Sequence, residues 1–317
     1  MQGQPAKPAP VYKEAPFFKR LAIDFQKHKY KYLLILPIIV YLILFCYKPM
    51  YGLVIAFKNY RPTRGIWGSN WVGFLWFETF FKDPYFWRLL RNTFTISALT
   101  ILFGFPAPIL LALLLNEVRN NKFKRTVQTI TYMPYFISLV VTCSLLKIYC
   151  MENGLFPQIM ELFGAQRQNL LANPKYFYPI YILSDIWQGI GWNSIIYLAA
   201  LSGIDQEQYE AARIDGANRL QQVIHITLPG LMPTITILFI LRMGNILNVG
   251  YEKILLLYNP STYEVADVLS TYTYRTGLEN QQYSLSTAVG LFNTMVNVVF
   301  LLITNYISKR STESGLF

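Results

Sequence analysis

Six long apolar runs constrain this chain more than any other feature of its sequence. A bilayer core about 30 Å thick needs roughly 20 consecutive apolar residues in a helix. Runs of that length recur at approximately 32–57, 92–116, 126–150, 176–201, 231–258 and 285–307. The composition agrees, because 14% of the residues are charged, against about 25% in soluble domains. The sequence therefore predicts an all-α integral membrane protein with six spans.

Prolines lie inside several of the predicted spans, at Pro37, Pro106, Pro108 and Pro134. A span tolerates a proline when neighbouring helices satisfy the freed carbonyl groups. The prolines therefore favour a packed helical bundle over isolated membrane anchors. The first and fifth runs are longer than a bilayer needs, which predicts tilt or an extension into water.

Lysine and arginine are concentrated beside the predicted spans. Residues 1–31 carry seven of them and residues 117–125 carry four, and Lys309 and Arg310 follow the last span. Because basic residues remain on the cytoplasmic side, both termini should face the cytoplasm. The loops 117–125 and 202–230 should lie on that side as well, and the segments 58–91, 151–175 and 259–284 should be external.

The first 31 residues differ from the rest of the chain. Residues 1–16 are rich in proline, alanine, glutamine and lysine, which predicts a disordered tail. Residues 17–31 carry apolar side chains on one helical face and basic ones beside them, as in a helix on an anionic membrane surface. We therefore expect a cytoplasmic tail and interfacial basic helix at 1–31. The six-span domain follows at 32–310 and contains the cytoplasmic loop 202–230.

The charge and the cysteines exclude several function classes. The net charge of +11 does not indicate nucleic-acid binding, because the basic residues flank the spans. Cys46, Cys143 and Cys150 lie in or beside apolar runs and lack CxxC spacing, so we expect them to be core residues. The two histidines, His28 and His225, are far apart. We expect neither a metal site nor a catalytic residue.

The predicted external segment 58–91 is dense in aromatic residues. They are Trp67, Trp71, Phe74, Trp76, Phe77, Phe80, Phe81, Tyr85, Phe86 and Trp87. Tryptophan and tyrosine favour the headgroup level of a membrane, so an interfacial belt is one interpretation. A docking surface for an external partner is the other, and the sequence leaves both open.

A polar insert separates the fourth and fifth predicted spans. Asp205 and Gln208 have the spacing of a capping box at a helix start, and Gly216 stands where a left-handed turn would end that helix. A second short helix over about 217–226 should follow and end before Pro229. Two polar helices of this kind belong in water, where another protein can bind them.

The residue order of this insert resembles the EAA loop of ABC importer permeases. The matching positions are Glu210-Ala211-Ala212, Asp215-Gly216-Ala217, Ile226, Leu228-Pro229 and Pro233. Segments elsewhere resemble the LplB-like oligosaccharide or polysaccharide branch of the sugar-uptake permeases, at 87–94, 110–118, 194–204 and 285–293. The resemblance implies the transmembrane domain of a maltose-type, type I ABC importer with both termini inside. Asp205 and Val223 depart from the pattern, where proline and an aromatic residue are frequent.

The resemblance also implies a mechanism. In such importers the EAA helices are coupling helices that insert into a groove of a separate ATPase subunit. ATP binding draws the coupling helices together and switches the spans from inward-facing to outward-facing, while an external binding protein delivers the substrate. The residues implied in ATPase coupling are Tyr209, Glu210, Ala211, Ala212, Asp215, Gly216 and Ala217.

The implied partners follow from the same resemblance. They are a second permease subunit, two ATPase subunits, an extracellular or periplasmic sugar-binding protein, and the lipid of the bacterial cytoplasmic membrane. A non-identical second permease is expected, and a homodimer is the alternative. The sequence contains no Gly-Lys dipeptide and hence no P-loop. We therefore expect ATP and Mg in the partner ATPase and no cofactor in this chain.

Polar and aromatic side chains in the predicted spans are candidates for the substrate path, because ionisable and amide groups are costly in a membrane. Aromatic faces and amides suit the ring faces and hydroxyls of a sugar. The candidates are Asp185, Trp187, Gln188, Trp192 and Asn193 in span four, Arg242, Asn245, Asn248 and Glu252 in span five, and Asn293 and Asn297 in span six. By the resemblance, Tyr135 and Ser138 join them. The alternative is that the amides bond helices together.

Arg242 and Asp185 stand near mid-depth on spans that flank the same loop. An unpaired arginine at that depth costs about 2.5–3.5 kcal/mol on insertion scales. Two hypotheses follow: either the two side chains pair with each other, or Arg242 binds an acidic sugar.

Two other function classes compete with a sugar importer. An ion-coupled secondary sugar transporter would need a relay of buried carboxylates, which the spans do not display. A membrane enzyme would need a HExxH zinc pair or clustered catalytic carboxylates, and the sequence has neither. The resemblance therefore implies the non-catalytic permease subunit of an ATP-driven, binding-protein-dependent importer of an oligosaccharide or polysaccharide fragment, working by alternating access.

Overall fold

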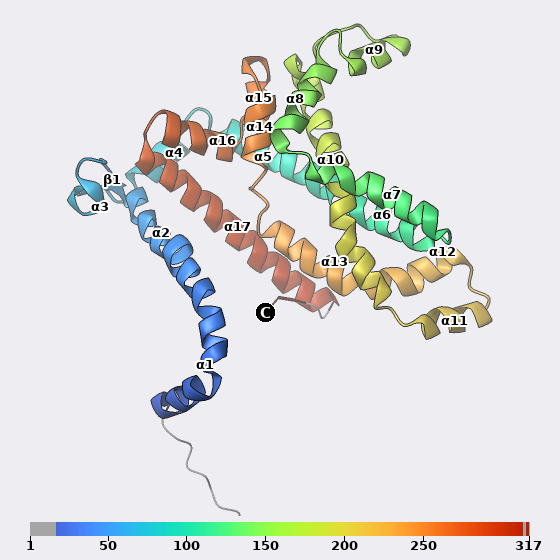
Figure 1. Cartoon of the computed structure of the whole chain (residues 1–317). Coiled ribbons are helices and arrows are strands. Elements are labelled where there is room, and N and C mark those ends of the chain that lie inside the picture. The colour runs from blue at the N-terminus through green and yellow to red at the C-terminus, as the bar shows by residue number, and fades with distance from the viewer. Residues whose placement is uncertain (1–16, 313–314, 317) are drawn as a thin grey trace, which may run out of the picture. The chain divides into compact units, whose positions relative to one another are not determined.

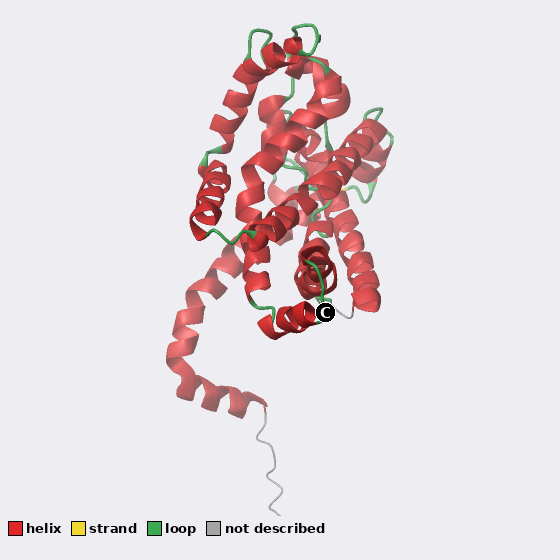
Figure 2. Cartoon of the chain, turned by 90° about the vertical axis from the view of Figure 1, so that its right-hand side faces the viewer, coloured by secondary structure: helices red, strands yellow, loops and turns green. Residues whose placement is uncertain are grey.

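The computed structural model describes residues 17–312, 315 and 316, so the tail predicted at 1–16 lies outside the described residues. Most of the described chain is helical, and loops join the helices (Figure 2). The predicted all-α class is confirmed. The chain forms two compact units, Met1–Val54 and Ile55–Phe317.

The first unit is a succession of helical segments. They are α1 (Phe17–Tyr41), the π-helix η1 (Leu42–Tyr47), α2 (Lys48–Met50) and the 3-10 helix η2 (Tyr51–Phe57), which ends in the second unit. His28 has non-helical angles, φ −121° and ψ 25°, and so interrupts α1 near the predicted start of the first span. The stretch Lys27–Phe57 is long and apolar enough to cross a membrane, as predicted.

Three π-helical segments each end two residues before a proline. The pairs are η1 (Leu42–Tyr47) with Pro49, η3 (Thr100–Gly104) with Pro106, and η6 (Val223–Thr227) with Pro229. A proline lacks an N–H and clashes with the carbonyl four residues earlier. In each case the residue before the proline bonds five residues back, as Leu228 does to Val223. The π turn therefore lets the helix continue through the proline.

Five helical stretches among the described residues are long and apolar enough to be membrane spans. They are Lys27–Phe57, Phe86–Glu117, Leu139–Leu162, Arg219–Met243 and Tyr283–Arg310. Helix α10 (Pro174–Ser202) has 29 residues, and at 1.5 Å per residue its length of about 43 Å exceeds the bilayer core. Its polar residues, among them Asp185, Gln188 and Asn193, lower its hydropathy. With α10, each of the six predicted runs overlaps a long helical stretch.

Two of the predicted spans are wrong as continuous helices. In the third, α7 (Asn121–Tyr132) and the 3-10 helix η4 (Met133–Phe136) are followed by two extended residues before α8 (Leu139–Cys150) begins. In the fifth, α13 (Leu228–Met243) ends, and α14 (Tyr251–Leu257) begins only after Gly250, which has φ +65°. Each break is short, and the apolar residues around it kept both predicted spans hydrophobic on average, so hydropathy did not detect the breaks, although residues 244–250 include two asparagines and two glycines.

Helix α10 lies at the centre of the second unit. It packs along α6 (Pro106–Glu117) and α7, and α13 packs beside α17 (Tyr283–Thr312) (Figure 1). At Gly191 a Cβ atom would lie 2.2 Å from the carbonyl oxygen of Thr131. A glycine is therefore required where α10 crosses α7.

Apolar side chains between these helices form the core. One cluster joins α6, α10 and α13 and consists of Ile109, Ala112, Tyr197, Leu201 and Leu231. Cys143 and Cys150 are buried, as predicted, whereas Cys46 is exposed and its predicted core position is wrong. Cys46 lies on η1, which has no buried residues. An apolar stretch of sequence therefore does not by itself place a residue in a protein core.

Short elements cover the end of the second unit that carries the predicted external segments. They are β1 (Lys58–Asn59), α3 (Gly65–Gly68), β2 (Asn70–Trp71), α4 (Leu75–Phe81), the start of α5 (Phe86–Leu99), α9 (Leu155–Leu162), η5 (Leu170–Ala172), η7 (Pro260–Thr262), α15 (Tyr263–Ala266), α16 (Leu269–Tyr274) and the π-helix η8 (Arg275–Glu279). Strands β1 and β2 pair antiparallel, with Lys58 opposite Trp71.

The aromatic residues predicted as a group in segment 58–91 form a buried set and an exposed set, and Trp76 is half-buried. Phe77, Phe80 and Phe86 are buried, and Phe80 packs edge-on against Phe86 at 5.0 Å between ring centroids. The exposed set is Trp67, Trp71, Phe74, Phe81, Tyr85 and Trp87. The aromatic density therefore serves the core in part, and the exposed set stays available for lipid or a partner.

Candidate coupling loop and translocation cavity

The polar insert starts with helix α11 (Gln206–Ile214), which the sequence predicts. The side chain of Asp205 accepts the backbone N–H of Glu207 at 3.0 Å and so caps the helix. The capping box predicted for Asp205 and Gln208 is wrong, because Asp205 caps α11 without a reciprocal bond from Gln208. The box of this loop is formed by Asn218 and Gln221, at the start of α12 (Arg219–Gln222). Sequence spacing alone did not distinguish the two positions.

Gly216 ends α11 in the left-handed conformation, with φ +80°. The N–H of Ala217 donates to the carbonyl of Ala212 at 2.8 Å, and the N–H of Gly216 donates to the carbonyl of Arg213 at 3.1 Å. These two bonds form a Schellman motif, in which a residue with positive φ is needed. The turn predicted at Gly216 is confirmed.

The second helix of the insert does not end before Pro229, so that prediction is wrong. Helix α12 runs into the π-helix η6, and η6 runs into α13 without a break. The π turn accommodates the proline, as described above. The second half of the insert and the fifth span are therefore one continuous helical rod, Arg219–Met243.

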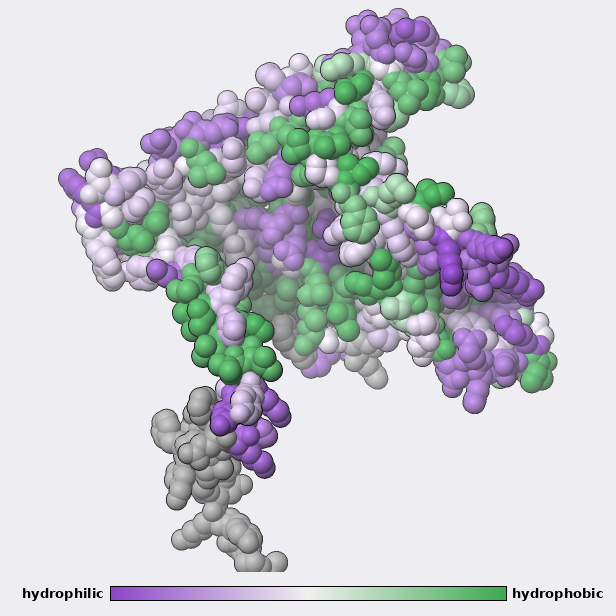
Figure 3. All heavy atoms as spheres, viewed as in Figure 1, coloured by the Kyte–Doolittle hydropathy of each residue, from purple (hydrophilic) through white to green (hydrophobic). Residues whose placement is uncertain are grey.

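The insert presents an exposed surface. In Figure 1, α11 lies at the end of the second unit opposite α9, and Figure 3 shows hydrophilic side chains gathered over it. Glu210, Ala211, Asp215 and Gly216 are exposed, and Tyr209, Ala212 and Ala217 are half-buried. Two large apolar side chains are also exposed, Ile214 at 86% and Leu220 at 68%. Neither side chain is buried within the described chain, so both are accessible to a partner protein.

One side-chain hydrogen bond joins the two halves of the insert. The hydroxyls of Tyr209 and Thr227 lie 3.0 Å apart, and Thr227 is buried. A groove of about 300 Å³ lies at the junction of α11 and α12. Its lining is Ala212, Asp215, Gly216, Ala217, Gln221, Gln222, His225 and Ile226. Four of the predicted coupling residues thus line this groove, namely Ala212, Asp215, Gly216 and Ala217. A fifth, Tyr209, makes the hydrogen bond that joins the two halves of the insert.

A cavity of about 450 Å³ lies between α10, α13 and the α5–α6 helix. Four of the predicted path residues line it: Asp185 and Asn193 from α10, Arg242 from the last turn of α13, and Asn245 just beyond it. The cavity also has apolar walls from Phe105, Ile186 and Leu238. Polar groups converging in an apolar cavity are typical of a ligand site.

The predicted helical stripe of Arg242, Asn245, Asn248 and Glu252 is wrong, because α13 ends at Met243. The irregular segment after it brings three asparagines together in another way. The Asn248 side chain donates to Asn245 Oδ1 at 3.1 Å and accepts from Asn293 Nδ2 at 3.0 Å. Figure 3 shows hydrophilic side chains in a hollow between α17 and α10. The buried Asn297 instead accepts the N–H of Leu247 at 2.9 Å and joins α17 to this segment.

The remaining candidates from spans three and four occupy separate places. Trp192 stacks on Tyr135 with ring centroids 4.6 Å apart and planes 5° from parallel. The Gln188 side chain donates to the carbonyl of Ile137 at 3.1 Å, so it satisfies the break in the third span. Ser138 caps α8 by accepting the N–H of Val141 at 3.4 Å. Trp187 lines a different, apolar cavity beside α8 and α9.

Asp185 pairs with Lys253 rather than with Arg242. The Lys253 ammonium lies 3.3 Å from Asp185 Oδ1, and no ion pair of Arg242 is present in residues 17–312. The predicted Arg242–Asp185 pair is therefore wrong. Sequence reasoning missed Lys253 because a lysine near the end of a predicted span resembles an interfacial charge. Glu252 lines a neighbouring cavity of about 290 Å³.

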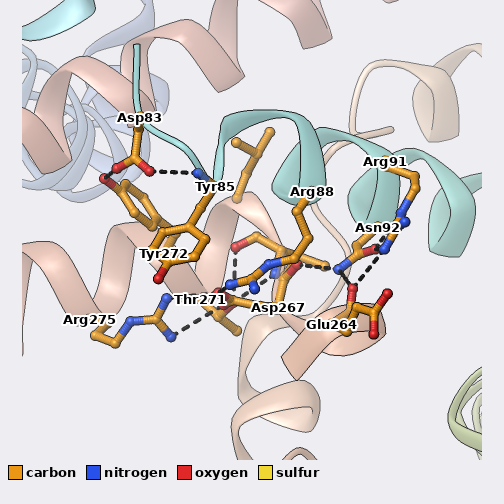
Figure 4. Close-up of polar contacts among 12 residues, drawn as sticks. Asp83, Tyr85, Arg88, Arg91, Asn92, Glu264, Asp267, Thr271, Tyr272 and Arg275 are labelled. Carbon is orange, nitrogen blue, oxygen red and sulfur yellow. Dashed lines mark hydrogen bonds and ion pairs between the residues drawn. The ribbon is translucent and has the colours of Figure 1, made fainter. Parts of the chain in front are cut away.

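A second charged group that the sequence did not reveal lies at the external end (Figure 4). The Asp267 carboxylate is buried and pairs with Arg275 at 2.8 Å and with Arg88 at 3.5 Å. Asn92 donates to the carbonyls of Glu264 and Asp267 at 2.8 and 2.9 Å. The group fastens the start of α5 to α15 and η8. Its members are up to 187 positions apart in the sequence, so no local motif marks them.

Burial and hydrogen bonding shift two titrations in this group. Burial works to lower the pKa of Arg275, but the hydrogen bonds and attraction of the Asp267 carboxylate prevail and raise it. Burial and a 2.6 Å hydrogen bond to Asp83 raise the pKa of the Tyr272 hydroxyl. Both side chains therefore keep their protons at physiological pH, and the network is intact there.

Known proteins resemble this chain over almost its whole length. Residues 104–313 match the family described as "Binding-protein-dependent transport system inner membrane component". The polygalacturonan/rhamnogalacturonan transport system permease protein YteP of Bacillus subtilis (strain 168) is 45% identical, covering 99% of this chain and 98% of that protein. LplB of the same organism is 43% identical, covering 92% of each.

A solved structure is similar as well. It is that of a bacterial ABC transporter involved in the import of the acidic polysaccharide alginate, with a TM-score of 0.85 and 44% identity, covering 92% of this chain and 99% of that chain. The LplB-like resemblance and the type I importer fold predicted from the sequence are confirmed. The chain belongs to the family of binding-protein-dependent transport system inner membrane components and is an integral, non-catalytic permease of the bacterial cytoplasmic membrane.

Proposed function

We propose that this permease carries an oligosaccharide or polysaccharide fragment through the cytoplasmic membrane, driven by a separate ATPase and working by alternating access. The observation that carries the proposal is the exposed coupling loop, with its glycine turn at Gly216 and the exposed apolar side chains of Ile214 and Leu220. Similar permeases are named for the transport of polygalacturonan and rhamnogalacturonan, and of alginate.

The coupling loop is the part of the chain that would bind the ATPase and follow its conformational change. Glu210, Ala211, Asp215 and Gly216 offer an exposed surface, and the neighbouring groove admits a partner's side chains. The Tyr209–Thr227 hydrogen bond then joins α11 to the rod that becomes α13. Arg242 lies 15 residues beyond Thr227 on this rod, about 22 Å away along the helix. A displacement of the loop would thus move one wall of the cavity.

The same proposal requires three kinds of partner. Two ATPase subunits would bind two coupling loops, one from this chain and one from a second permease, which we expect to be non-identical. ATP and Mg would bind to the ATPase subunits. An external binding protein would deliver the sugar, and a similar transporter has been solved with an alginate pentasaccharide-bound periplasmic protein. The exposed aromatic residues Trp67, Trp71 and Trp87 are the docking surface that we propose for it.

The substrate path in this proposal combines the cavity with the asparagine group beside it. Asn193, Asn245 and Asn248 present amides to sugar hydroxyls, and the stacked pair of Trp192 and Tyr135 presents an aromatic face. We assign Asn297 and Gln188 to helix packing instead, because each satisfies a backbone group at a helix break. This division separates the two roles that the sequence left open for the polar residues.

Transport by purified components in proteoliposomes tests the proposal. Uptake of a uronic or neutral oligosaccharide should require the binding protein and ATP, and a partner ATPase that binds but does not hydrolyse ATP should abolish it. Ionophores that collapse proton and sodium gradients should leave uptake unchanged. Uptake that persists with the inactive ATPase and stops with the ionophores would establish an ion-coupled secondary transporter instead.

A further inference from the structure

The charged side chains around the cavity indicate which class of sugar it accepts. We propose that Lys253 neutralises Asp185 and thereby leaves Arg242 free to bind a carboxylate, so that the cavity selects oligosaccharides that contain uronic acids. This inference rests on the proposed transport function. It adds to that function a substrate class, a carboxylate-binding residue and a residue that sets the local charge.

Lys253 is held in place from several directions. Its side chain is 4% exposed, and its ammonium donates to the carbonyl of Tyr181 at 3.0 Å and lies 4.6 Å from the centre of the Tyr181 ring. The third contact is the Asp185 carboxylate at 3.3 Å. A buried ammonium without its anion is strongly destabilised. Lys253 therefore binds Asp185 persistently, although 49% of the Asp185 side chain is exposed toward the cavities.

Arg242 has no anionic partner among the described residues. Its side chain is half-buried and lines the cavity of about 450 Å³. In the part of the chain that the structure describes, its guanidinium has neither an ion pair nor a hydrogen bond to a side chain. A guanidinium presents five N–H donors in a planar fork that matches the two oxygens of a carboxylate. The missing partner is therefore a planar anion that enters with the substrate.

The balance of charge around the cavity points the same way. Asp185 and Arg242 are the charged residues among those that line it. With Lys253 bound to Asp185, one net positive charge remains, and without Lys253 the lining would be neutral. Glu252 lines the neighbouring cavity of about 290 Å³ and not this one. A carboxylate-bearing sugar thus meets an unbalanced cation, and a neutral sugar would leave that cation unpaired.

The amides beside Arg242 complete a site for a sugar acid. Asn193 and Asn245 line the same cavity, and Asn245 Oδ1 also accepts a hydrogen bond from Asn248. Amides recognise hydroxyls as donors and acceptors, whereas a guanidinium only donates. The carboxylate and the hydroxyls of one uronic residue would therefore be bound by different side chains.

The test compares uptake of a uronic-acid trisaccharide by the full transporter in proteoliposomes. Arg242→Gln should lower uptake by about tenfold or more, because the substrate carboxylate loses its cation. Lys253→Met should lower uptake by a similar factor, because Asp185 loses its cation. In Lys253→Met the freed Asp185 carboxylate would compete for Arg242. The double variant Lys253→Met with Asp185→Asn restores the unbalanced cation and should recover to within about threefold of the natural chain. Lys253→Arg, which keeps the cation, should retain uptake.

A matched control and a second sugar make the result specific. Lys147→Met removes an exposed lysine of α8 that lies outside both cavities, and it should leave uptake unchanged. The carboxyl-reduced, neutral trisaccharide should lose its dependence on Arg242 wherever the binding protein delivers it. A double variant no better than Lys253→Met, or full acidic uptake in Arg242→Gln, would overturn the inference while ATP-driven transport stands. Absence of ATP-dependent uptake in the natural chain would overturn both.

Discussion

The hydroxyl of Tyr209 lies 3.0 Å from the hydroxyl of Thr227, and this contact ties the coupling helix α11 to the rod that continues into α13. The two residues stand on either side of the Gly216 turn. The exposed surface of the insert and one wall of the cavity are thus joined by this hydrogen bond and by the continuous helical rod Arg219–Met243. A disturbance of this path should affect coupling more than assembly.

Tyr209→Phe tests this path directly. The variant loses one partly buried hydrogen bond, which is worth about 0.5–1.5 kcal/mol. We expect the ratio of sugar transported to ATP hydrolysed to fall severalfold, while the ATPase still copurifies. Thr227→Val removes the same bond from the other side. The double variant should therefore be no worse than either single one, and additive losses would show that the two hydroxyls act separately.

Gly216→Val should release the ATPase. The left-handed φ of +80° disfavours a β-branched residue, and the strain costs about 1–3 kcal/mol. A Cβ atom at this position meets nothing within 4 Å, so strain rather than a clash would unwind the turn. We expect the amount of ATPase that copurifies with the permease to fall. Gly164→Val is a matched control, because Gly164 has φ +85° and equally open space in the predicted external segment 151–175. Equal loss of the ATPase in both variants would contradict the role of the coupling loop.

Asp267→Asn should destabilise the external end of the bundle. It leaves Arg88 and Arg275 without their buried anion, and breaking a buried pair in this way costs about 3–5 kcal/mol. The midpoint of thermal unfolding in detergent should fall by several degrees. Glu78→Gln breaks an exposed pair with Lys82 and should leave the midpoint unchanged, because such pairs are screened by solvent. An unchanged midpoint in Asp267→Asn would show that the buried network does not stabilise the fold.

Gly191→Ala should separate α10 from α7. The added Cβ would lie 2.2 Å from the Thr131 carbonyl oxygen, and such overpacking costs about 1–3 kcal/mol. Unfolding should occur at a lower temperature, and transport should fall with it. Gly290→Ala in α17 adds the same atom with nothing within 4 Å. That control should be neutral or slightly stabilising, since alanine favours a helix. Equal midpoints for the two variants would reject the close approach at Gly191.

Hydropathy and charge located the long helices and the coupling loop because both depend on local composition. Each of the six apolar runs overlaps a long helical stretch. Gly216 marked the turn because a glycine readily adopts the positive φ that this turn requires. The helix breaks near Ser138 and Asn245 were missed, since both are short and lie between apolar residues that dominate the average hydropathy. The continuation of the helix through Pro229 was missed as well. A proline in the sequence signals the end of a helix, whereas the π turn that accommodates it has no equally strong sequence signal.

The electrostatic partners could not be predicted because they are set by tertiary packing. Arg242 and Asp185 were matched on depth alone, whereas the structure assigns Asp185 to Lys253 beyond the end of α13. The pair of Asp267 with Arg88 joins residues that are 179 positions apart. A single sequence identifies costly charges in a membrane protein, but the partner of each depends on how the helices cross.

Photo-crosslinking from the coupling loop tests the central claim most directly. A photoreactive amino acid in place of Ile214, which is 86% exposed, should form a crosslink to the ATPase subunit in the assembled transporter. The same amino acid in place of Leu162 on α9, which is 83% exposed, should form none. A crosslink from position 214 whose yield changes with ATP is the predicted result. An assembled, active transporter in which position 214 never reaches the ATPase would contradict the account.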